Sequence, residues 1–193
     1  MPTPIGHGLA GIAAGWAVGG VARDDRRALV RQVATLAALG AAADLDLLIN
    51  WHSGPTHSVG AAAIAGLVAA AWRWPIARSR WLIFVAAFAA WATHPLLDSL
   101  APDTSPPIGV MAFWPITTRY FITGLDVFMP IWRAPGNLKA VAHDVVAVAR
   151  EVAILAPVVY FTWKTSRGLK VGKSGSREVG KSGSREVGKS RSD

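Results

Sequence analysis

Histidine and aspartate residues gather at the ends of apolar segments in this 193-residue chain, where solubility does not explain them. Imidazole nitrogens and carboxylate oxygens bind zinc, manganese and iron, and no cysteine is present to supply a thiolate. A bound divalent ion activates water near neutral pH, so such a centre points to hydrolysis. The candidate ligands are His7, Asp44, Asp46, His52, His57, His94 and Asp98.

The clearest spacing in this set is that of His94 and Asp98, which are four residues apart. On an α-helix this spacing places both side chains on one face, about a turn apart, where they could chelate one ion. Pro95 fits either the first turn of a helix or a kink, so the sequence leaves the helical geometry open. The alternative is a His–Asp hydrogen bond at a helix end.

Asp44 and Asp46 are two residues apart and would diverge on a regular helix. Both could face one centre only if the helix ends or unwinds there, and Gly54 and Pro55 favour a break soon afterwards. Otherwise one is a ligand and the other a capping or water-facing carboxylate. His52 and His57 flank the Gly-Pro turn. His7 taken alone would be an ordinary interfacial histidine, and it is a candidate ligand only because the other histidines and aspartates are expected at the same membrane face.

The composition indicates the elements that must position these residues. Hydrophobic residues make up 52% of the chain and charged residues 17%, against about 25% in soluble domains. We therefore predict an all-α, polytopic transmembrane helical bundle of four to five spans. The amino-terminal segment lacks the basic region typical of a cleaved signal peptide, so we expect its apolar run to be retained as a helix. The apolar runs cover residues 5–22, 29–43, 59–72, 81–97 and 145–163.

Two further segments complete the predicted organisation. Residues 108–132 are apolar but interrupted by proline, which suggests a re-entrant or interfacial segment. Residues 1–168 form the predicted transmembrane domain. Residues 169–193 form a predicted disordered, basic, low-complexity tail that repeats VGKSGSRE and has no aromatic residue. Glycines every four residues, at Gly11, Gly15 and Gly19, allow close helix approach or simply reflect a composition rich in small residues.

Arginines in the short loops predict the orientation. Residues 50–58 have no lysine or arginine, whereas two other connections hold seven arginines. We therefore expect these two connections and the tail to face the cytoplasm, and the amino terminus, residues 50–58 and residues 98–140 to face outside. All the candidate ligands then lie at the outer face. The seven arginines are Arg23, Arg26, Arg27, Arg31, Arg73, Arg78 and Arg80.

The order of these motifs resembles the YdjM-type family, whose members are inner-membrane-associated proteins regarded as metal-dependent hydrolases. The resemblance covers residues 7–126. The chain departs from the family pattern at Ala43, where the family often has proline, and at Ser53, where arginine often follows the first loop histidine. It also has Pro115-Ile116-Thr117 where the family usually has Pro-Phe-Ser, a change that keeps a hydroxyl. The matching elements are His7, Asp44-Leu45-Asp46, His52 to Thr56-His57-Ser58, His94-Pro95-Leu96-Leu97-Asp98-Ser99 and Trp114-Pro115-Ile116-Thr117.

The resemblance and the ligands together predict a metal-dependent hydrolase in the bacterial inner membrane, acting on a phosphoester or ester at the outer face. Its cofactor would be one or two divalent ions, zinc in the first instance, with manganese or iron as alternatives. Asp46, as general base, and Asp98 are the predicted catalytic residues. The predicted partners are membrane lipids and a lipid-linked substrate, and no nucleic acid. The alternative is a non-enzymatic metal-binding membrane protein or a cation transporter.

Overall fold

The computed structural model describes residues 1–49, 53–104, 106–132, 134 and 136–169. These residues form helices and no strand beyond two isolated bridges, so the all-α prediction is confirmed. A 3₁₀-helix, η1, directly continues α2. The elements are α1 (Pro4–Gly19), α2 (Arg26–Ala41), η1 (Ala42–Ile49), α3 (Val59–Ala71), α4 (Arg80–Ser99) and α5 (Leu138–Thr165).

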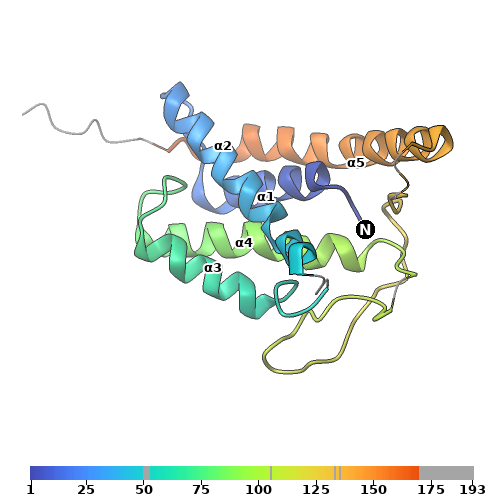
Figure 1. Ribbon diagram of the computed structural model, residues 1–193. Helices are drawn as coiled ribbons and strands as arrows, with labels where there is room; N and C mark the ends of the chain where they lie inside the picture. The colour runs from blue at the N-terminus through green and yellow to red at the C-terminus, as the bar shows by residue number, and fades with distance from the viewer. Residues whose placement is uncertain (50–52, 105, 133, 135, 170–193) are drawn as a thin grey trace, which may run out of the picture.

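Helix α1 lies in the middle of the bundle and packs against α2, α4 and α5, while α3 packs on α4 (Figure 1). Small residues permit the closest of these approaches. A Cβ atom on Gly11 would lie 2.6 Å from the carbonyl oxygen of Leu36 and 2.9 Å from the Cα of Gly40. The glycine stripe of α1 is therefore a packing surface, and it brings the α1 and α2 backbones almost into contact.

Three helical segments are long and apolar enough to cross a membrane: Arg26–Leu48, Arg80–Ser99 and Leu138–Thr165. By contrast, α1 has 16 residues and α3 has 13, short of the roughly 20 needed for a span. Three candidate spans are therefore shown, out of the four to five predicted. Helix α5 exposes a row of large apolar side chains, as a lipid-facing helix would: Val141, Val145, Val146, Val152, Val158, Tyr160 and Phe161.

Different chain segments lie at the two ends of the bundle. The α3–α4 connection and the end of α5 lie at one end, and the amino terminus and residues 100–132 at the other (Figure 1). At the first end, the buried Gln32 amide ties three segments together. Its nitrogen donates to the carbonyls of Gly20 and Ile76 at 2.8 Å each, and its oxygen accepts from Ala22 and Trp16 at 3.1 Å each.

The segment after α4 is irregular and folds back over the bundle. The amide of Val59 donates to Ala112 at 2.9 Å and that of Gly60 to Trp114 at 3.0 Å, which packs the Trp-Pro element against the start of α3. Helix α5 begins at Leu138, seven residues before the predicted apolar run. Leu169 is buried and donates to Val21 at 2.6 Å, whereas the predicted tail from residue 170 lies outside the described residues.

Candidate metal centre

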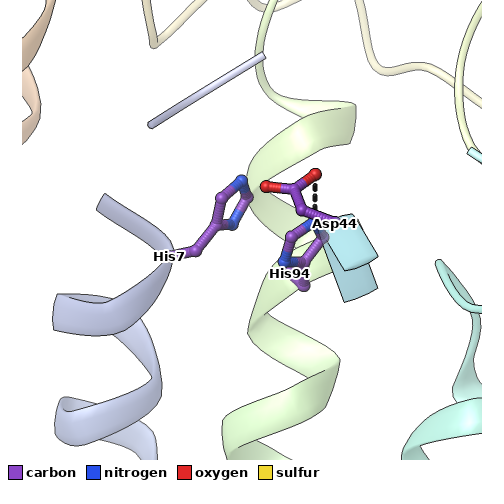
Figure 2. A group of neighbouring side chains, drawn as sticks. All are labelled: His7, Asp44 and His94. Atoms are coloured by element: carbon purple, nitrogen blue, oxygen red, sulfur yellow. Dashed lines mark ion pairs between the residues drawn. The ribbon is translucent and has the colours of Figure 1, made fainter. Parts of the chain in front are cut away.

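Four separate elements deliver histidine and aspartate side chains to one buried point of the bundle. Helix α1, the η1 segment and α4 contribute the three residues drawn in Figure 2, which point toward one another. The loop before α3 adds a third histidine, and the last turn of α4 adds a second carboxylate. The five residues are His7, Asp44, His57, His94 and Asp98.

His94 lies at the centre of this group. Its Nε2 is 3.1 Å from Nε2 of His57, 3.4 Å from Oδ1 of Asp44 and 3.3 Å from Oδ2 of Asp98. Helix α4 continues unbroken through Pro95, so His94 and Asp98 do share one helix face as their spacing indicated. All three imidazoles in the group, including that of His7, are fully buried.

The carboxylate of Asp98 lies between His7 on one side and the pair His57 and His94 on the other. Its Oδ1 is 3.3 Å from Nε2 of His7, and its Oδ2 is 3.4 Å from Nε2 of His57. Yet neither nitrogen of His7 and neither oxygen of Asp98 has a hydrogen-bond partner within the described residues. Buried polar atoms are almost always paired, so the Asp98 carboxylate and the facing Nε2 of His7 call for a partner that a divalent cation would supply. The donor set therefore fits a metal.

The outer nitrogen of His94 is fixed by the backbone. His94 Nδ1 lies 2.7 Å from the carbonyl oxygen of Gly40. Because a carbonyl oxygen only accepts, Nδ1 carries the proton and Nε2 presents its lone pair to the group. Metal-binding histidines are commonly oriented in this way by an outer hydrogen bond.

Asp46 takes the corresponding place behind His57. Its Oδ2 lies 3.1 Å from His57 Nδ1 and accepts a 2.6 Å hydrogen bond from the Thr56 hydroxyl. Burial lowers the pKa of His57, but the neighbouring carboxylates of Asp44 and Asp46 outweigh it, so the pKa is raised above its ordinary value. Because η1 is a 3₁₀-helix, the two aspartates reach opposite sides of His57.

The structure thus brings six of the seven predicted site residues together. Two groups could each hold an ion, namely His7–Asp44–His94 and His57–His94–Asp98, with ligand atoms within 4.8 Å of one another. Asp46 belongs to neither group. His52 lies outside the described residues, and the metal-binding and catalytic roles of all seven stay predictions.

A family model for the YdjM inner membrane protein matches residues 1–169, which include every described helix and the whole site. This chain belongs to the YdjM inner membrane protein family. The resemblance found in the motifs is confirmed by this match. No curated protein and no solved structure matches the chain.

One further polar residue, Glu151, supports the site of this YdjM-family protein and was not predicted from the sequence. Glu151, fully buried in α5, accepts from the amide of Thr3 at 2.8 Å and from its hydroxyl at 2.5 Å. Gly6 leaves room for it, because a Cβ there would lie 2.6 Å from Glu151 Oε2. Glu151 thereby holds the first turn of α1, one turn before His7. The available signal in the sequence is a glutamate, beside Arg150, within the apolar run of residues 145–163.

Proposed function

We propose that this YdjM-family protein is a membrane-bound, metal-dependent hydrolase that acts on an ester or phosphoester at the membrane surface. The observation that carries the proposal is the buried carboxylate of Asp98, which lies within 3.4 Å of three fully buried imidazoles although neither of its oxygens makes a hydrogen bond within the described residues. A bundle that faces lipid tolerates such groups only where they have a function.

Two ions would be held by the two groups, His57–His94–Asp98 and His7–Asp44–His94. Asp98, which lies 3.3 Å from His7, would also serve the second group. Nitrogen and carboxylate ligands without thiolate suit zinc, with manganese and iron as alternatives. When bound, the metal would supply Lewis acidity that activates water near neutral pH.

The protein's own residues would orient the ligands of this site. Gly40 and Asp46 hold the outer nitrogens of His94 and His57, so that the two Nε2 atoms, 3.1 Å apart, would be the ones to bind an ion. Asp44 is the member of the group whose side chain is partly exposed, at 20%. Asp44 would therefore lie where water and substrate reach the group. Asp46, predicted as the base, is engaged with Thr56 and His57 and is 5% exposed, so we assign it an orienting role.

We further propose that the site faces outside and the arginine-rich connections face the cytoplasm, in the inner membrane. Helices α2, α4 and α5 would cross it, with α1 and α3 completing a bundle of four to five spans. A site at the membrane surface favours a lipid or lipid-linked substrate. The burial of all three imidazoles favours a second candidate, a structural metal site without catalysis.

The experiment is a hydrolysis screen of the purified protein in detergent, stripped with a chelator and reloaded with zinc, manganese or iron. Chromogenic phosphoesters, carboxylic esters and phospholipids would be offered. We expect metal-dependent turnover that falls at least about 100-fold in Asp98→Asn, since this change removes a shared ligand. His143→Ala is the matched control, because His143 bonds Pro130 at 2.9 Å and lies outside the site. Full metal loading without turnover would refute the hydrolase proposal and favour a structural metal site. Turnover that is unchanged in Asp98→Asn would refute the assignment of Asp98 as a metal ligand.

A further inference from the structure

A second site candidate lies at the arginine-rich end of the bundle, opposite the metal centre. A cavity of about 380 Å³ opens there between the end of α1, the start of α4 and the segment after α5. Its polar wall includes Arg78, Arg167 and Ser166, and its apolar wall includes Val18 and Leu82. Charged and apolar surfaces therefore meet in one hollow.

Backbone hydrogen bonds hold the polar wall in place. The carbonyl of Arg167 accepts from Val21 at 2.9 Å, and two residues later Leu169 donates back to Val21 at 2.6 Å. Near Arg78, the carbonyl of Ile76 accepts from the buried Gln32 amide at 2.8 Å. Both arginines thus extend from backbone that is tied to the α1–α2 connection.

Among the described residues, no acidic side chain neutralises the charge of this cavity. Arg78 and Arg167 are exposed, and neither has an ion pair within the described part of the chain. No aspartate or glutamate lines the cavity. Two arginines and a serine line this cavity, and a phosphate suits such a lining because an arginine can donate two parallel hydrogen bonds to it.

We propose that this cavity binds the phosphate of an anionic membrane lipid, with the lipid's acyl region against Val18 and Leu82. The apolar wall favours a lipid over free phosphate, because inorganic phosphate has no apolar part that could contact this wall. Anionic lipids also attract basic residues next to membrane helices. This site stands apart from the metal centre and does not depend on hydrolysis.

The competing explanation is that these arginines only add to the general positive charge of this end. The chain offers a matched test, since Arg26 and Arg27 are also exposed but lie on a single helix, α2. Arg78→Gln/Arg167→Gln and Arg26→Gln/Arg27→Gln remove the same charge. Only the first pair removes the guanidinium groups of the cavity.

The experiment measures binding of phosphatidylglycerol and of phosphatidylcholine to the full-length protein in neutral detergent by native mass spectrometry. We expect preferential phosphatidylglycerol binding by the unaltered protein and by the α2 pair, and at least a tenfold loss in the cavity pair. Circular dichroism and thermal melting would verify that both pairs fold.

Equal losses in the two pairs, or no preference for phosphatidylglycerol, would overturn the proposal. A further arm adds inorganic phosphate at millimolar concentration. Failure to displace the lipid supports a lipid site, whereas full displacement would assign the cavity to free phosphate and overturn the lipid assignment. A cavity pair that does not fold is replaced by Arg167→Lys, for which we expect weakened but measurable binding; unchanged binding would overturn the proposal.

Discussion

The carbonyl oxygen of Gly40 accepts a 2.7 Å hydrogen bond from Nδ1 of His94. The same glycine lies so close to α1 that a Cβ would collide with the carbonyl oxygen of His7. One residue of α2 therefore sets the orientation of one candidate ligand and the position of another. The close packing of α1 and α2 is in this sense part of the metal centre.

Gly40→Ala should destabilise the protein by about 1–3 kcal/mol, because the added methyl group would push α1 away from α2. It should also weaken metal binding, since Gly40 and His7 would both move. Thermal melting in detergent and metal titration check the two effects. Gly168→Ala is the control, because a Cβ there meets nothing within 4 Å. Equal behaviour of the two variants would contradict this packing.

Asp46→Asn should weaken metal affinity by about 10–100-fold without abolishing binding, as expected for an orienting carboxylate behind a ligand. Asparagine retains the size of aspartate but loses the charge that faces His57 Nδ1. Competition with a fluorescent zinc chelator measures the affinity. Asp24→Asn, an exposed change outside the site, should have no effect. A complete loss of metal in Asp46→Asn would make Asp46 a ligand, as first predicted.

Glu151→Ala should lower stability by about 1.5–3 kcal/mol, because a hydrogen-bonded carboxylate is removed and the start of α1 is released. Metal affinity should fall with it, since His7 follows one turn later. Glu151→Gln, which can still accept from the Thr3 amide, should recover part of both losses. Thermal melting and metal titration report on both, with Arg150→Gln as the exposed neighbour. If metal affinity is unchanged in Glu151→Ala and stability does not recover in Glu151→Gln, Glu151 does not support the site.

The orientation can be tested by cysteine labelling, because the chain has no cysteine of its own. Thr104 and Asp24 are both exposed. Thr104 follows α4 and Asp24 precedes α2, and these two chain segments lie at opposite ends of the bundle (Figure 1). An impermeant thiol reagent should label Thr104→Cys in intact cells and Asp24→Cys only after the membrane is opened. The reverse pattern would invert the protein in the membrane.

Part of the site could be predicted from the sequence because it depends on local geometry. The shared helix face of His94 and Asp98 follows directly from helix periodicity. The unwinding of the helix that Asp44 and Asp46 were expected to require is present as the 3₁₀-helix η1. Helix packing decides the rest. Gln32 and Glu151 look like interruptions of apolar runs until their partners, far away in sequence, are known. The role of Asp46 likewise depends on which nitrogen of His57 it faces.

The most direct test of the metal centre is the metal content of the purified protein, measured by inductively coupled plasma mass spectrometry. We expect about two ions for each unaltered chain, about two in the His143→Ala control, about one in His7→Ala and near none in Asp98→Ala. Folding of each variant is verified by circular dichroism. Metal content in Asp98→Ala equal to that of the unaltered protein, or no metal in either after loading, would contradict the account.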